Sequence, residues 1–197
     1  MTQPAKLNFK VYQGSTFEEV LRWESSTKVY VPITGITKAA PVVITAPAHG
    51  IPVGWRARVT NVAGMKEINC SEEEYYTVTA NTTDTVTINS INAVGYTAYT
   101  SGGILEYNQP VDLTGYTARM HIREKLDSTS IVLQLTTENS RILIDNTLKT
   151  ITLKISATDT AALGFTQAVY NLELVSSSGV VTSLITGNLQ LIKEVTR

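Results

Sequence analysis

The sequence predicts an all-β protein with antiparallel sheets, on three observations. Apolar and polar residues alternate strictly from Tyr116 to Arg123, with Ala118, Met120 and Ile122 on the apolar face, which is the pattern of a half-buried strand. Further alternating segments are separated by turns rich in Gly, Ser or Pro. Charged residues make up only 17% of the 197 residues, against about 25% in typical domains, and β-branched Thr, which favours sheet, supplies much of the polarity.

Two alternating segments open the chain, within residues 5–24. The turn at 13–15 separates them, so the pattern predicts a hairpin. Glu19 interrupts the apolar face of the second segment, 17–23. A short helix is the alternative for that segment, but the glycine in the turn favours a strand.

Residues 34–107 have a different pattern, with frequent Pro and Gly and shorter apolar runs. Short strands are expected at 42–45, 55–60, 76–80 and 85–89. Short strands between frequent turns predict a small barrel or a rolled sheet.

The longer pattern returns after Tyr107. Strands are expected at 116–123, 131–136, 142–144, 151–155, 170–174, 181–186 and 188–195, the last two separated by Gly187. Ser156 and Asp159 resemble a capping box, which predicts one helical turn ending before Gly164. Regular strands with one such turn passing between sheets are typical of an antiparallel β-sandwich.

The domain organisation follows from these patterns. The strands before residue 25 are too few to fold alone. We therefore expect residues 1–34 and 108–197 to form the sandwich together, and residues 35–107 to be an inserted small β-barrel domain.

Composition excludes several classes of partner and cofactor. The net charge is −1, and 16 basic residues are interspersed with 17 acidic ones, so no basic stripe for nucleic acid is expected. Cys70 is the single cysteine, which rules out an internal disulfide or a Cys-rich metal site and is typical of a reducing cytoplasm. No apolar run predicts a membrane span, and residues 1–4 do not resemble a signal peptide.

No catalytic, cofactor-binding or metal-binding residue is predicted. His49 and His121 are the only histidines. His49 precedes a glycine in an expected turn, where it would hydrogen-bond the backbone. His121 lies on the polar face of its strand between Arg119 and Arg123, and is expected to face solvent or an interface. No His or Cys lies at ligand spacing, and no nucleophile elbow occurs.

The segment around residue 70 contains residue types that are typical of reactive or metal-binding sites, but each of them also has a structural interpretation. Gly64 is expected at positive φ in a turn, Met65 in the small domain's core, and Asn69 as a loop cap. Cys70 precedes Glu72–Glu74, whose charges would raise its pKa and make it a poor nucleophile. The glutamates lack the alternate spacing of a calcium loop, so a solvated loop is expected.

Five tyrosines cluster in or beside the middle segment. They could bind sugars, pack against another subunit, or fill the small barrel. They are Tyr75, Tyr76, Tyr96, Tyr99 and Tyr107.

Two resemblances bear on function. Residues 5–24 and 108–197 resemble the immunoglobulin-like domain of tailed-bacteriophage baseplate and tail adaptor proteins, through Gln13–Phe17, Asp112–Arg123, Ile155–Ala157, Tyr170–Leu174, Gly187 and Glu194–Arg197. Segment 36–107 resembles a phage structural module similar to a β-barrel half-domain of ubiquitin-activating enzymes, through Ile36–Pro41, Val43–Thr45, Ala48–Gly50, Gly64–Asn69 and Tyr99–Gly103.

These resemblances imply a non-enzymatic structural subunit of the tail, collar or baseplate. Its partners would be other phage virion proteins, and its place the virion, assembled in the host cytoplasm. The alternative is a carbohydrate- or host-receptor-binding module; a hydrolase would need paired carboxylates that the sequence does not show.

We expect the protein to assemble into a symmetric homo-oligomer, because a phage tail presents repeated equivalent sites. Near-neutral charge and Thr-rich strands suit self-association. The terminal segments 1–6 and 193–197 are expected to dock on neighbouring copies, with the insert projecting outward.

Overall fold

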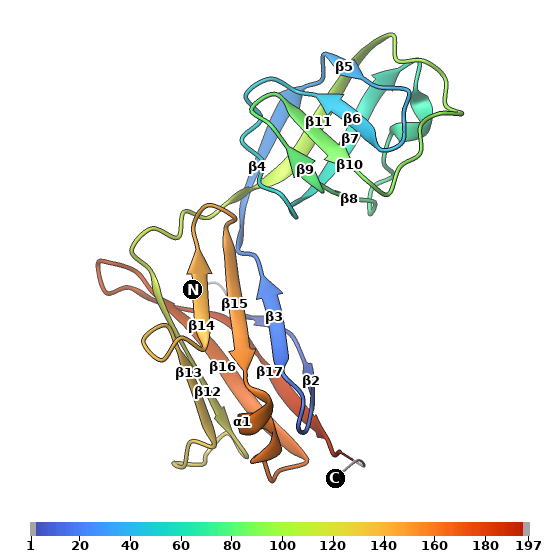
Figure 1. Cartoon of the computed structure of the whole chain (residues 1–197). Helices are drawn as coiled ribbons and strands as arrows, with labels where there is room; N and C mark the ends of the chain where they lie inside the picture. Colours follow the sequence, from blue (N-terminus) through green and yellow to red (C-terminus); the bar gives the residue numbers. More distant parts are fainter. Residues whose placement is uncertain (1–2, 195–197) are drawn as a thin grey trace. The chain divides into compact units, whose positions relative to one another are not determined.

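The computed structural model describes residues 3–194 and shows a mostly β protein with one short α-helix. The chain divides into two compact units (Figure 1). Unit 1 combines the start of the chain through Arg22 with the part from Asp112 onward, and unit 2 spans Trp23–Val111.

The larger sheet of unit 1 brings both ends of the chain together. Its order is β1-β17-β16-β12-β13, with β2 also on β17. Strands β1 and β2 run parallel to β17, whereas the other pairs are antiparallel. The expectation of wholly antiparallel pairing is therefore wrong at this edge. The strands are β1 (Ala5–Lys6), β2 (Phe9–Tyr12), β12 (Thr117–Arg123), β13 (Leu133–Thr136), β16 (Gln167–Val175) and β17 (Val181–Ile192).

Gly187 lies inside β17 instead of separating two strands. The expectation of two closing strands separated by Gly187 is therefore wrong. A glycine is needed at this position because the backbone of Leu7 approaches it closely, not because the chain turns there. A Cβ at Gly187 would fall 1.7 Å from the carbonyl oxygen of Leu7. Leu7 links β1 to β2 and donates its N–H to Thr186 O at 3.0 Å. The missing side chain thus leaves room for the backbone of Leu7, where the N-terminal segment runs along β17 between β1 and β2.

The smaller sheet of unit 1 forms a separate layer, in front of the larger sheet in Figure 1. It has the order β14-β15-β3 and is antiparallel. Its strands are β3 (Phe17–Leu21), β14 (Ile142–Asp145) and β15 (Thr150–Ile155).

The expected hairpin within residues 5–24 is wrong, because β2 and β3 belong to different sheets. The turn after Tyr12 carries the chain from one layer to the other. The Gln13 amide fixes this turn by donating to the carbonyl oxygens of Ala161 and Leu163 at 3.2 and 3.0 Å. Phe9 then packs between the layers, 5.4 Å from the ring of Phe17.

The helix α1 (Ala157–Ala161) begins as the sequence predicts. Ser156 is its N-cap and accepts the N–H of Asp159 through Oγ at 3.1 Å. The Asp159 carboxylate also accepts from Arg141 at 2.7 Å with both oxygens. The capping prediction is therefore confirmed.

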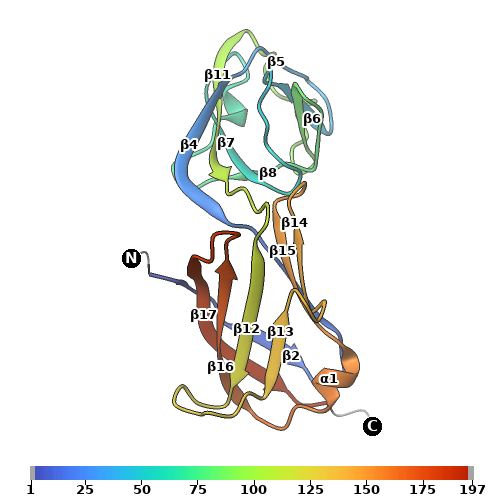
Figure 2. The ribbon, with the colours of Figure 1, turned by 90° about the vertical axis from the view of Figure 1, so that its left-hand side faces the viewer.

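Unit 2 contains two four-stranded sheets, β5-β6-β10-β9 and β4-β11-β7-β8 (Figure 2). The chain passes from one sheet to the other at two places. Ile33 N donates to Gly103 O and Thr34 N to Thr45 O, both at 2.9 Å, and Val78 N donates to Trp55 O at 2.9 Å and Thr79 N to Thr87 O at 2.8 Å. Among residues 3–194 no closed barrel is present, because β5, β8 and β9 are only two residues long. The elements are β4 (Glu24–Pro32), β5 (Gly35–Ile36), β6 (Val42–Thr45), β7 (Arg56–Ala63), a 3-10 helix (Lys66–Ile68), β8 (Tyr76–Thr77), β9 (Ala80–Asn81), β10 (Thr85–Ile88) and β11 (Ser101–Pro110).

The unit boundaries differ from the expected division at 34/35 and 107/108. Strand β4 pairs with β11 from Glu24 to Pro32, so residues assigned to the sandwich complete the second unit instead. Valines 29 and 31 pack against the core of unit 2. The alternating pattern of β4 predicts a strand but not the strand with which it pairs. The predicted unit boundary therefore differs from the observed one.

Trp55 anchors the core of unit 2. Its side chain is fully buried, and its indole Nε1 donates to Asn108 O at 2.8 Å. Met65 and Ile68 lie in the same cluster. The core thus joins both sheets and the short 3-10 helix.

Candidate binding groove on the larger sheet

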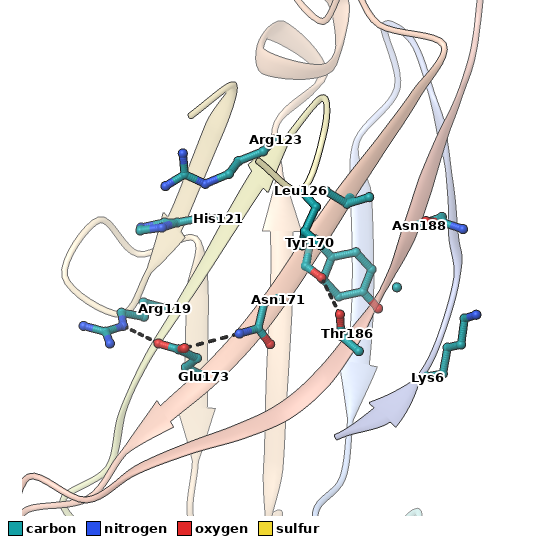
Figure 3. A pocket seen from close by; sticks show the side chains of 12 residues that line it. Lys6, Arg119, His121, Arg123, Leu126, Tyr170, Asn171, Glu173, Thr186 and Asn188 are labelled. Carbon is teal, nitrogen blue, oxygen red and sulfur yellow. Dashed lines mark hydrogen bonds and ion pairs between the residues drawn. The ribbon is translucent and has the colours of Figure 1, made fainter. Parts of the chain in front are cut away.

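A groove of about 400 Å³ lies on the outer face of the larger sheet of unit 1. Three side chains of β12 form one wall: Arg119, His121 and Arg123. Figure 3 shows them in a row, with Lys6 and Asn188 on the opposite side. The groove therefore crosses the sheet from β12 to β1.

The alternation of β12 places this row outside. Ala118, Met120 and Ile122 are buried, so the residues between them point the other way. This confirms the sequence prediction for the strand. Strand register sets Arg119 opposite Glu173 and His121 opposite Asn171 on β16.

A hydrogen-bond network fixes the middle of the groove. Arg119 Nε donates to Glu173 Oε2 at 2.7 Å, and Asn171 Nδ2 donates to Glu173 Oε1 at 3.2 Å. Ser183 Oγ donates to Asn171 Oδ1 at 2.7 Å. Both ends of the Asn171 amide are thus occupied within the protein.

The end of the groove at Arg123 is partly apolar. Arg123 Nη1 donates to Ser128 O at 2.7 Å, which holds the loop after β12. Leu126 in that loop is 83% exposed, and both Leu126 and Val169 line the groove. A ligand with an apolar part would find its contact here.

The floor and far wall depend on Gly187. Its close approach to Leu7 holds β1 against β17, with Lys6 paired to Thr186 in the strand register. Thr186 Oγ1 donates to Tyr170 O at 3.1 Å. Thr186 and Gly187 line the groove between the row on β12 and Lys6.

The groove is electropositive although the whole chain has a net charge of −1. Lys6, Arg119 and Arg123 carry three positive charges and Glu173 one negative charge, which gives +2 without His121. Burial lowers the pKa of His121, Arg123 and then Arg119 lower it further, and Glu173 opposes them. The positive charges of Arg119 and Arg123 thus lie on the same face of β12, where they repel each other.

The structure places His49 in unit 2, far along the chain from this groove. Its Nε2 lies 3.1 Å from Thr85 O, and its Nδ1 accepts the N–H of Ile51 at 3.0 Å. Tyr107 donates its hydroxyl to the His49 carbonyl oxygen. The expected loop-fixing role of His49 is confirmed.

The segment around residue 70 also has structural roles. Gly64 has φ +80°, and Met65 is fully buried. Asn69 pairs with both backbone groups of Val62, at 2.8 and 3.1 Å. Burial raises the pKa of Cys70, with Glu74 adding to the shift; the expected direction is right, but burial is the larger cause.

The acidic run Glu72–Glu74 is exposed, as expected. Within residues 3–194 no group of three or more His, Cys, Asp or Glu side chains could hold a metal ion.

The clustered tyrosines divide between core and surface. Tyr107 is buried, and the hydroxyls of Tyr76 and Tyr99 donate to the backbone of Ile68 and Ile33 at 3.2 and 3.1 Å. Tyr75 is exposed, with the guanidinium of Arg56 4.8 Å from its ring centre. Its ring is therefore already in contact with a cation.

The expected docking segments at the termini are only partly described. Residues 1–2 and 195–197 lie outside the described part of the chain. Residues 5 and 6 form β1 and pair within the protein, while Lys193 and Glu194 are exposed.

Sequence reasoning identified the polar face of β12 but missed the groove. The available signal was the row of Arg, His and Arg at two-residue spacing. Lys6, at the other end of the chain, could not be connected to it without the parallel pairing of β1 and β17.

No helix in the described part of the chain is long and apolar enough to cross a membrane. No model of a known protein family matches this sequence, and a search of curated proteins finds no significant match.

Proposed function

We propose that this protein is a structural subunit of a tailed-bacteriophage virion, in the tail, collar or baseplate. In this proposal unit 1 is an immunoglobulin-like β-sandwich and unit 2 is the inserted barrel-like module. One observation carries it: the two sequence resemblances divide along the chain as the two units do. Every motif quoted for the adaptor resemblance falls outside Trp23–Val111, with the matching ranges overlapping it only at 23–24 and 108–111, and every motif of the second module falls within it.

The layered architecture of unit 1 supports the sandwich assignment. Between its two sheets the ring of Phe9 contacts the rings of both Phe17 and Tyr170. Helix α1 follows β15 of one sheet and precedes β16 of the other. This order is consistent with the helical turn expected between sheets in such a fold.

Assembly into a symmetric homo-oligomer is part of the proposal. Among the described residues, β13 and β14 each pair on one side only, so their outer edges could accept a neighbour. Ile131 before β13 and Leu143 on β14 are exposed apolar residues near these edges. Analytical ultracentrifugation of the full chain should find one cyclic oligomer; a monomer at micromolar concentration would contradict this part.

The direct test of the virion role is mass spectrometry of purified phage particles. The protein should be present in stoichiometric amount with the other structural proteins. Its absence from intact particles would overturn the proposal.

A carbohydrate- or receptor-binding module is the second candidate, favoured by two exposed tyrosines of unit 2. Tyr30 lies opposite Glu106, which in turn lies opposite Arg58, and Tyr75 lies near Arg56 and Arg58. A glycan array with the full chain tests it. Binding that is lost in Tyr30→Ala and Tyr75→Ala would support this candidate over a purely structural role.

A further inference from the structure

We infer that the groove on unit 1 binds an extended, acidic peptide segment of a partner protein, with carboxylates at alternate positions. The inference rests on the groove itself and goes beyond the proposed virion role. Its basis is the charge, the spacing and the remaining hydrogen-bonding capacity of the lining side chains.

Charge identifies the ligand as anionic. The groove carries +2 from Lys6, Arg119, Arg123 and Glu173, and only Arg119 has an ion pair there within the described residues. Such a surface is disfavoured by its own repulsion and is relieved when negative groups bind. Guanidinium groups also match the planar geometry of carboxylates.

Spacing identifies the ligand as an extended chain. Arg119, His121 and Arg123 follow one another at every second position of β12, which is about 6.5–7 Å per step in a strand. Alternate side chains of an extended peptide have the same repeat. A peptide running parallel to β12, in the groove between this row and Lys6, can therefore present successive carboxylates to the row.

Hydrogen bonding favours a peptide over a polysaccharide. Sugar hydroxyls need side chains that both donate and accept, but the Asn171 amide and the Glu173 carboxylate are already bonded within the protein. Most of the remaining capacity is donor-only, from the amine of Lys6 and the guanidinium groups, and Asn188 and His121 are lining side chains that can also accept. The contact offered by Leu126 suits an apolar residue at one end of the segment.

The binding test uses a fluorescein-labelled peptide, Glu-Thr-Glu-Thr-Glu-Leu, with the full chain and fluorescence anisotropy at two salt concentrations. We expect saturable binding that weakens as salt rises. The peptide with Gln in place of Glu should not bind. Absence of binding at millimolar protein concentration overturns the inference.

The matched variants each remove two positive charges. Lys6→Gln with Arg123→Gln should weaken binding about tenfold, as expected for two partly exposed ion pairs. Lys38→Gln with Lys66→Gln, two exposed residues of unit 2, should bind as the unaltered protein does. An equal loss in both pairs would show non-specific attraction and overturn the inference.

A second readout needs no variant. A bound carboxylate beside His121 raises its pKa, which NMR follows with pH, while His49 in unit 2 serves as the internal control. An unchanged pKa of His121 at saturating peptide contradicts binding in the groove. Polygalacturonate displacing the peptide at lower carboxylate concentration would identify a polysaccharide instead, and would also overturn the inference.

These outcomes separate the two proposals. A protein found in virions that binds no peptide keeps the structural role and loses the groove's ligand. A protein that binds the peptide through the groove but is absent from particles keeps the docking site and loses the virion role.

Discussion

The two units differ in which parts of the chain complete their sheets. Unit 2 is one continuous segment, so all its sheet partners lie between Trp23 and Val111. Unit 1 is interrupted, and its larger sheet is completed by strands from opposite ends of the chain, with β1 and β2 on β17. Both units need distant strand pairs, but in unit 2 the pair of β4 and β11 closes one continuous segment, whereas unit 1 must bring the two ends of the chain together beside Gly187.

Both tryptophans of the chain lie in unit 2. Tryptophan fluorescence therefore follows the unfolding of unit 2, while circular dichroism follows both units. The two signals therefore separate the stability of one unit from that of the other.

Removing residues 23–111 tests the independence of the units most directly. Val111 N donates to Trp23 O at 3.1 Å, so the two chain crossings are adjacent and a short Gly-Ser linker can replace the insert. We expect the remaining chain to keep a cooperative β-type transition in circular dichroism, and Trp23–Val111 alone to fold. An excised product with a random-coil spectrum would show that unit 1 requires unit 2.

Trp55→Ala should destabilise unit 2 by about 3–5 kcal/mol, because it opens a cavity and leaves Asn108 O without its donor. Fluorescence of Trp23 in a denaturant titration measures the change. Tyr75→Ala, at an exposed position, is the control and should cost much less. An equal shift of the unit 1 transition would contradict the separation of the units.

Gly187→Ala should destabilise unit 1 by about 1–3 kcal/mol, because its new Cβ would overlap the backbone of Leu7. The transition seen by circular dichroism should move while the fluorescence transition does not. Gly164→Ala is the matched control, since a Cβ there meets nothing within 4 Å. Equal stability of the two variants would refute the role given to the crossing.

Ser156→Ala should cost unit 1 about 1 kcal/mol through loss of the cap on α1. Ser156→Thr keeps a hydroxyl acceptor and should restore most of the stability. Thermal unfolding of the three proteins measures this. If the threonine variant is as unstable as the alanine variant, the cap is not the cause.

Acid should weaken unit 1 through Asp112. Hydrogen bonds from Asn146 and then Thr114 lower its pKa to about 2. Because the folded pKa is lower than the unfolded one, the contribution is present above about pH 4 and is lost as the pH falls towards 2. Asp112→Asn should flatten this part of the pH profile of unit 1 and leave the fluorescence transition of unit 2 unchanged.

The candidate site shows how far sequence reasoning reached. The outward row of Arg119, His121 and Arg123 follows from the two-residue period of one strand, which needs no knowledge of the rest of the fold. The opposite wall at Lys6 follows only from the parallel pairing with β17. No local pattern carries that pairing, because residues 5 and 185 are far apart in the chain.

The sequence by itself determined the elements whose cause is local. The buried face of β12, the cap at Ser156 and the bond from Ile51 N–H to His49 Nδ1 all depend on residues within a few positions of one another. Tertiary structure alone decided which strands are neighbours: β3 joins β15, β4 joins β11, and Gly187 continues a strand instead of ending it. The physical reason is that alternation sets which face of a strand is buried, whereas its partner is set by the packing of segments distant in sequence.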